Sequence, residues 1–159
     1  MSDGHTTLAP FYQGWDAYQG LLTEALAPLS PEQLALRAAP SLRPAWVLAA
    51  HIVSARVHWY QRVMGERDQD LTPLISWDDD GEPQRSAAEL VGGLEATWQL
   101  MQACLARWTA ATLEDTFTTP RGAVHTRQWI VWHVVEHDLH HGGELCLTLG
   151  MHGLPVPDL

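Results

Sequence analysis

Residues 44–65 read PAWVLAAHIVSARVHWYQRVMG and residues 66–85 read ERDQDLTPLISWDDDGEPQR, and these two neighbouring stretches decide the fold. The first stretch opens with Pro44, which suits the first turn of a helix, and continues with apolar residues at helical spacing. The second stretch is polar and interrupted by Pro73 and Pro83, so it predicts a connection of about 20 residues. Adjacent antiparallel helices need only about 2–8 residues between them. A connection this long can instead cross the length of a bundle and make its two helices parallel; a long surface loop in a simple up-down bundle is the alternative.

Three further helical segments lie on either side of this stretch. Apolar periodicity and helix breakers predict them at about residues 7–26, 86–111 and 126–149. The sequence SAAE at residues 86–89 has the spacing of a capping box, and no strong strand pattern or repeat is present. The prediction is therefore an all-α fold: one domain over residues 1–159, a four-helix bundle of up-down-down-up topology with a long crossover between the second and third helices.

Composition and charge exclude several classes of protein. Nineteen acidic residues against nine arginines, with no lysine, give a net charge of -10, which argues against binding to a nucleic-acid backbone. Two cysteines, Cys104 and Cys146, make no disulfide framework. The first residues lack the basic and apolar pattern of a signal peptide, and no apolar run approaches the roughly 20 residues of a membrane span. We therefore expect a cytoplasmic protein without membrane or nucleic-acid partners.

Histidines concentrate in the last predicted helix, where residues 132–145 read WHVVEHDLHHGGEL. Positions four apart lie on one face of a helix, so His133, His137 and His141 form a row, with Glu144 on the same side. Two histidines at this spacing can hold one metal ion, although such a pair alone is a weak signal.

A third histidine on another helix strengthens this prediction. His51 lies in the apolar run LAAHIVSA, where an imidazole without a partner would cost roughly 1–3 kcal/mol. If the second and fourth helices are antiparallel, His51 lies about 10 Å from the start of its helix and His141 about 12 Å from the end of the other, at matching levels. This arrangement favours His51, His137 and His141 as ligands, with His133 one helical turn further into the bundle than His137. His58, about 10 Å further along, is interpreted as a core or pocket residue.

Three neutral imidazoles suit Zn(II), Ni(II) or Fe(II) and leave a coordination position open, as in catalytic sites. Such an ion could acidify a bound water or thiol, or polarise a carbonyl. Glu144 is placed to orient a ligand or a bound water, and an outward salt bridge is the alternative for it. A polar core without metal is the alternative for the histidines.

These stretches resemble a known family. Residues 41–60, SLRPAWVLAAHIVSARVHWY, look like the second helix of the DinB-like (DinB/YfiT) proteins, and residues 132–145 resemble that family's His-x-x-x-His motif before a glycine. The resemblance covers essentially the whole chain. It implies an up-down-down-up four-helix bundle, often dimeric, with one divalent metal ion, Zn or Ni, held by His51, His137 and His141.

The sequence departs from the family's common fourth-helix pattern, His-Arg-Gly-Gln, at two positions. Here the four residues are His141, Gly142, Gly143 and Glu144. The arginine is missing and the glutamine is replaced by an acid near the metal, while the ligands remain.

The resemblance also implies a function. Characterised relatives include S-transferases that use bacillithiol and mycothiol-dependent maleylpyruvate isomerases. The leading hypothesis is a metal-dependent transferase that activates a low-molecular-weight thiol of this type, with a small-molecule thiol and an electrophile as substrates. Cys146 lies about 180° round the helix from His137 and is not expected to be the nucleophile. The alternatives are a hydrolase that uses metal-bound hydroxide with Glu144 as general base, and a non-catalytic metal- or ligand-binding stress protein.

The last helix is apolar on its reverse side as well. That side carries Val131, Trp132, Val135, Leu139, Cys146 and Leu149. A helix that is apolar all round is normally buried on both sides, which predicts a homodimer through this surface. Cover by the long connection, including Trp77, is the alternative.

Overall fold

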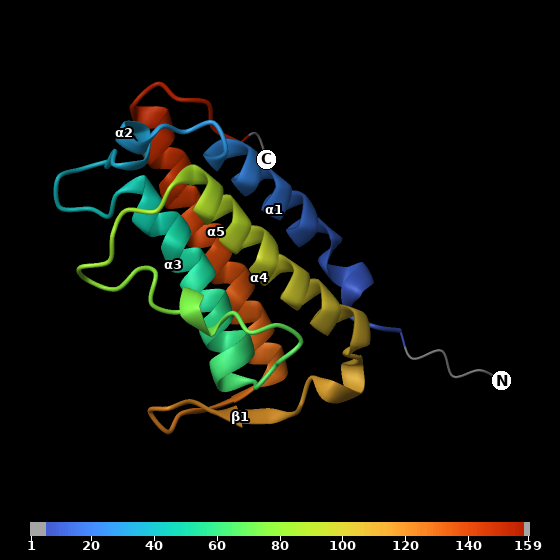
Figure 1. Cartoon of the computed structure of the whole chain (residues 1–159). Coiled ribbons are helices and arrows are strands. Elements are labelled where there is room, and N and C mark those ends of the chain that lie inside the picture. The colour runs from blue at the N-terminus through green and yellow to red at the C-terminus, as the bar shows by residue number, and fades with distance from the viewer. Residues whose placement is uncertain (1–5, 158–159) are drawn as a thin grey trace.

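The computed structural model describes residues 6–157, and its frame is four long helices. They are α1 (Gln13–Leu26), α3 (Ala45–Val57), α4 (Ala87–Arg107) and α5 (Arg127–Met151). Helices α1 and α5 run in one direction and α3 and α4 in the other (Figure 1). The segment between α3 and α4 returns along the bundle, so the two helices are parallel. The predicted up-down-down-up bundle with a long crossover is therefore confirmed.

Short elements link the long helices. They are the 3₁₀ turns η1 (Ala9–Tyr12), η3 (Thr72–Leu74) and η4 (Ala110–Thr112), the single-turn helix α2 (Pro31–Leu34), and a π-helical turn, η2 (His58–Val63), that continues α3. None of these short turns was expected from the periodicity. The capping box at the start of α4 is confirmed, since the Ser86 side chain accepts from Glu89 N–H and the Glu89 carboxylate accepts from Ser86 N–H.

Helix α4 ends earlier than the predicted residue 111. Trp108 has extended backbone (ψ 147°) and its indole is buried, stacked on the Tyr60 ring at 5.6 Å between centroids. Burying this large side chain against α3–η2 turns the chain out of the helix, an effect that local periodicity does not encode.

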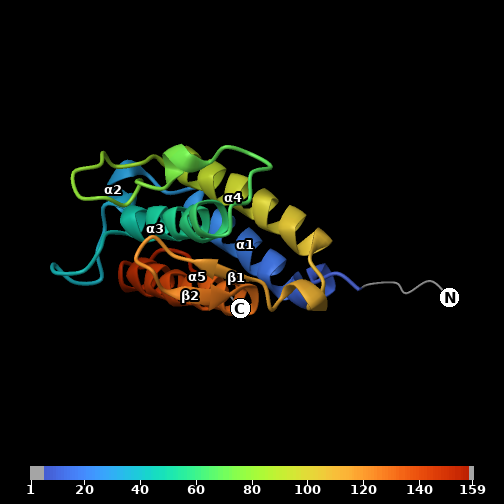
Figure 2. The same cartoon turned by 90° about the horizontal axis from the view of Figure 1, so that it is seen from below.

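The absence of a strand pattern in the sequence was misleading, because the chain forms a small hairpin. Strands β1 (Thr116–Thr118) and β2 (Val124–Thr126) pair antiparallel, with Phe117 opposite His125. Three-residue strands are too short for alternation to stand out. The turn between them contains Gly122 at φ +86°, a conformation that suits glycine. His125 lies in β2. Seen from below, the hairpin crosses the end of the bundle beside α5 (Figure 2).

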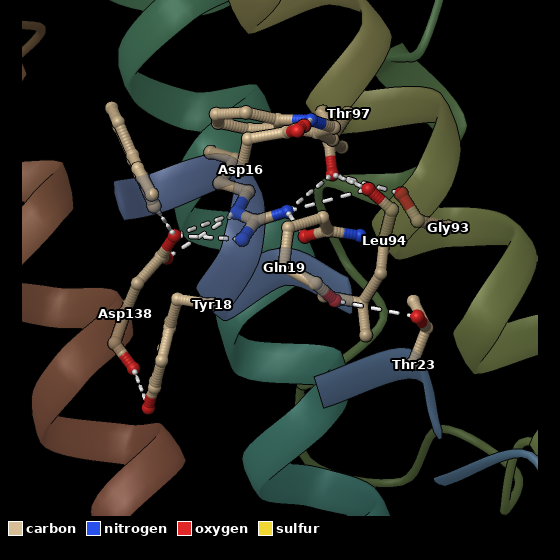
Figure 3. A network of polar contacts seen from close by, with 11 residues as sticks. Asp16, Tyr18, Gln19, Thr23, Gly93, Leu94, Thr97 and Asp138 are labelled. Carbon is tan, nitrogen blue, oxygen red and sulfur yellow. Dashed lines mark hydrogen bonds and ion pairs between the residues drawn. The ribbon is translucent and has the colours of Figure 1, made fainter. Parts of the chain in front are cut away.

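The interior contains two apolar clusters with a polar layer between them. Arg56 and Asp138 form a fully buried ion pair, with 1% and 0% of their side chains exposed and Nη2 2.7 Å from Oδ2. Trp15 Nε1–H also donates to Asp138 Oδ2, at 2.7 Å. Arg56 Nη1–H donates to Gln19 Oε1 (2.8 Å) and Thr97 Oγ1 (3.3 Å) (Figure 3). This network joins all four long helices, and the sequence interpretation did not anticipate it.

The reverse side of α5 is only partly covered. Val131 and Leu149 are buried, whereas Trp132 and Leu139 are 61% and 48% exposed. Trp77 packs against Gly93 of α4 rather than on this surface, so cover by the crossover is wrong. The homodimer stays a prediction. Exposed apolar residues do not make α5 a membrane helix: within residues 6–157, no helix combines the length and apolarity that a bilayer crossing requires.

Candidate metal centre

Three histidines from two facing helices converge in the groove between α3 and α5. One ring nitrogen each of His51, His137 and His141 lies within 4.8 Å of the other two. His51 Nε2 and His137 Nε2 are 3.1 Å apart, and the His51 ring centroid is 4.6 Å from that of His141. The antiparallel packing of α3 on α5 therefore brings together the three residues that the sequence predicted.

Two carboxylates orient two of these rings. Asp78 Oδ2 lies 2.5 Å from His51 Nδ1, and Glu144 Oε2 lies 2.7 Å from His141 Nδ1. An ionised carboxylate only accepts hydrogen bonds, so it favours the tautomer in which each Nδ1–H donates to it, and in that tautomer the lone pair of each Nε2 is free. Carboxylate–histidine pairs of this kind fix the ring and raise its basicity toward a metal ion.

The third ring, His137, is partly buried. Burial, reinforced by the neighbouring His141 and His51, lowers the pKa of His137 to about 3, so its imidazole is neutral at pH 7. Its Nδ1 is buried and has no hydrogen-bond partner among residues 6–157. Burial also lowers the pKa of His141, although the hydrogen bond with Glu144 acts in the opposite direction. Three convergent imidazole nitrogens, one of them on the neutral His137 ring with a second nitrogen that has no partner in the described part of the chain, fit a divalent cation.

Asp78 belongs to the crossover, and the sequence interpretation missed it. Burial alone would raise the pKa of Asp78, but hydrogen bonds from His51 and Ser54 outweigh it and lower the pKa, so the carboxylate stays ionised. Three consecutive aspartates, residues 78–80, gave the only signal. Nothing in their spacing tells which one reaches His51, because the loop has no periodicity.

The other histidines of the row lie outside this centre. His133 stacks on Trp129 at 4.8 Å between centroids, and its ring is 6.1 Å from that of His137. His140, His141 and Glu144 also lie within 4.8 Å of one another, but His140 is exposed and all three come from one turn of one helix. The convergence from two helices therefore distinguishes the predicted set.

Two cavities meet at His51, and a third, of about 390 Å³, borders His137 and His141 on the side of His133 and His140. The larger, about 690 Å³, contains His51 and His137 and extends along α3 toward the hairpin, past His58, Trp59 and Arg62. The smaller, about 390 Å³, contains His51, His141 and Glu144. It extends the other way, toward residues 41–43 before α3 and residues 147–148 near the end of α5. Because both are lined by His51 and they extend in opposite directions along the groove, the candidate centre is accessible from two sides.

Gly142 has no room for a larger side chain next to His141. A Cβ at Gly142 would overlap the Tyr18 hydroxyl of α1. The same hydroxyl donates to the Asp138 carbonyl at 3.4 Å. A larger residue at position 142 would push α1 away from α5, so this chain does not accommodate the arginine of the His-Arg-Gly-Gln pattern there.

Comparisons with known proteins agree with this architecture. A DinB-like protein from Bacillus cereus ATCC 10987 has a TM-score of 0.77 at 22% identity, covering 98% of this chain and 99% of that one. A DinB-like protein from Bacillus subtilis has a TM-score of 0.67 at 16% identity, covering 94% and 96%. At these identities the likeness concerns the fold. A search of curated proteins finds no match. The family model of the DinB superfamily matches residues 14–145, a range that contains all three converging histidines, and the chain therefore belongs to the DinB superfamily.

Proposed function

We propose that the protein is a metal-dependent transferase that joins a low-molecular-weight thiol to an electrophilic small molecule. The observation that carries this proposal is the convergence of His51, His137 and His141 at a point reached by two cavities. A single open cavity would suffice for one substrate and water. Two cavities that share His51, one bordered also by His137 and the other by His141, suit two organic substrates that approach from opposite sides.

Each residue of the centre has a role in this proposal. A divalent ion, Zn or Ni, when bound, would lower the pKa of a thiol at neutral pH. His51, His137 and His141 would hold the ion, with His137 kept neutral by burial. Asp78 and Glu144 would hold the His51 and His141 rings by their Nδ1 protons.

The chain's own cysteines are poor candidates for the nucleophile. Burial raises the pKa of Cys146, and it raises the pKa of Cys104 to about 12, so both thiols stay protonated at neutral pH. The reacting thiol is therefore a substrate.

A hydrolase is the second candidate. Glu144 lines the smaller cavity and its side chain is 43% exposed, so its carboxylate can reach a water molecule there. In this alternative Glu144 acts as general base, and no thiol is needed. A metal- or ligand-binding protein without catalysis is the third candidate.

An assay with and without thiol separates these functions. The zinc- or nickel-loaded protein is mixed with monochlorobimane and bacillithiol, mycothiol or glutathione, and the fluorescent S-conjugate is followed. We expect thiol-dependent conjugation above the uncatalysed rate, lost in His141→Ala and retained in the control Cys146→Ser. Hydrolysis of ester substrates at a rate independent of thiol would favour the hydrolase. A fully loaded protein without either activity on a broad panel would favour the binding protein.

We also propose a homodimer through the side of α5 that exposes Trp132 and Leu139. Sedimentation equilibrium should give a dimer mass that Trp132→Glu shifts toward the monomer. A monomer mass at all concentrations would contradict it.

A further inference from the structure

The larger cavity has a basic end, away from the histidine cluster. Arg62, on the π-helical turn η2, and Arg121, in the turn of the hairpin, both line it. Within residues 6–157, neither guanidinium forms an ion pair or a hydrogen bond with another side chain.

Four of the other seven arginines of this acidic chain form ion pairs. Arg56, Arg85, Arg107 and Arg127 each contact a carboxylate. In a protein with a net charge of -10, two unpaired guanidinium groups at one cavity are an unusual concentration of positive charge. Guanidinium groups without a partner are suited to bind carboxylate or phosphate.

His58 shows that both cations act on the same place. It lines the cavity, and its pKa is lowered first by burial and then by the positive charges of Arg62 and Arg121. His58 is therefore a neutral hydrogen-bonding group in the same cavity as the two cations, and it does not compete with them for an anion.

The wall of the cavity is aromatic. The Trp59 ring meets the rings of His125 and His133 edge-on, at 5.8 and 5.0 Å between centroids. Trp129 is stacked between these two histidines, at 3.7 Å from His125 and 4.8 Å from His133, which holds the wall in place. Such a wall favours a flat apolar body.

The acidic residues of the cavity lie on the side of the histidine cluster. Asp78, bound to His51, and the exposed Asp79 line this part. Their charge repels an anionic group, whereas Arg62 and Arg121 attract it, so the cavity orients a ligand that carries one charged end.

We propose that the larger cavity binds a small organic acid with a flat apolar body. Its carboxylate or phosphate contacts Arg62 and Arg121, its body lies on Trp59, and its uncharged end points to His51 and His137. This assignment names the chemical class of one substrate of the proposed function. It rests on that function only in calling the organic acid a substrate, because binding of the acid to the cavity needs no metal.

A matched pair of probes tests the proposal: 2-naphthoate and 2-naphthamide share a flat body and differ in charge. Calorimetric titrations use the zinc-loaded full chain. We expect naphthoate to bind roughly tenfold tighter than naphthamide, as one or two charge-assisted contacts in a solvated cavity provide. Arg62→Gln and Arg121→Gln should each weaken naphthoate about three- to tenfold and leave naphthamide unchanged. Trp59→Leu should weaken both probes.

Arg67→Gln is the control, because it removes the same charge from an exposed position near Arg62 that does not line this cavity. It should bind naphthoate like the wild type. Equal affinity for the two probes, or an Arg67→Gln effect as large as that of Arg62→Gln, would overturn the proposal.

The same titrations separate the subsite from the proposed reaction. Arginine-dependent naphthoate binding that persists in chelator-treated protein supports the subsite even if no thiol transfer is found. Thiol transfer with naphthoate binding unaffected by both arginine variants would leave the transferase standing and overturn the subsite.

Discussion

Helix α5 carries two polar centres on consecutive residues, His137 and Asp138, and they differ in kind. Asp138 is fully buried, and its charge is cancelled within the protein by Arg56. His137 belongs to a cluster of three nitrogens of the same type, which opens onto two cavities. The first centre is complete without any ligand, whereas the second, in the proposed function, would be completed by a cation from outside. A buried charged group that is paired with an opposite charge inside the bundle holds the helices together. Several acceptor atoms that converge without an opposite charge between them indicate a binding site.

The largest expected effect is on the stability that depends on the buried Arg56–Asp138 ion pair. Asp138→Ala leaves the Arg56 guanidinium buried without a counter-charge, so it should lower the free energy of unfolding by about 3–5 kcal/mol. Urea denaturation of the metal-free protein measures it. The double variant Arg56→Met/Asp138→Leu removes both charges and should recover most of the loss. If His141→Ala destabilised the metal-free protein as much as Asp138→Ala, the distinction between the two centres would be wrong.

Substitutions of the adjacent glycines Gly142 and Gly143 test the packing of Tyr18 of α1 against α5, next to both Asp138 and His141. Gly142→Ala forces a methyl group onto the Tyr18 hydroxyl and should destabilise the protein by about 1–3 kcal/mol. Gly143→Ala is the control, because nothing lies within 4 Å of its added methyl group. It should stabilise the helix by roughly 0.5–1 kcal/mol. Thermal denaturation of both variants gives the comparison, and equal effects would contradict the close packing of α1 on α5.

Asp78, in the crossover, should affect metal binding by the three histidines and not the Arg56–Asp138 ion pair. Asp78→Asn weakens the acceptor for His51 Nδ1–H and should lower metal affinity about 10- to 100-fold, measured by competition with a chromophoric chelator. Asp79→Asn, the neighbouring exposed position, should change it less than twofold, within the ordinary scatter of surface substitutions. An equal loss in both variants would mean that general negative charge attracts the ion, and that Asp78 does not orient the ring.

The smallest effect is a titration shift in the larger cavity. Arg62→Gln removes one of the two cations that lower the pKa of His58, so this pKa should rise toward its usual value. It should stay below that value, because burial is the larger cause. Because the pKa of His58 is lower in the folded state than in the unfolded state, its contribution to stability is complete above the unfolded-state pKa. This contribution is lost as the pH falls from the unfolded-state pKa through the folded-state pKa. Histidine NMR resonances follow the titration; an unchanged His58 would place Arg62 too far away to act in the cavity.

Much of the fold, and the convergence of the three histidines of the candidate centre, could be predicted from the sequence. Helix periodicity and connection length are local properties, and together they give the topology. Once the second and fourth helices are antiparallel, the rise per residue places His51 level with His141. The same argument excludes His133, which lies toward Trp129.

The remaining features depend on contacts between distant residues. Arg56 looks like any surface arginine in the sequence, and its partner, Asp138, is 82 positions away. Asp78 is one of three adjacent aspartates in a loop without periodicity. Arg121 reaches the cavity only because a hairpin of two three-residue strands forms, and such short strands leave no pattern.

Metal content tests the central claim most directly. The purified protein and His141→Ala are reconstituted with Zn and Ni, desalted and measured by elemental mass spectrometry. The account predicts about one ion per chain in the wild type and loss of the ion in the variant, with both proteins folded by circular dichroism. No metal in the wild type after reconstitution, or equal metal in the two proteins, would contradict a site formed by His51, His137 and His141.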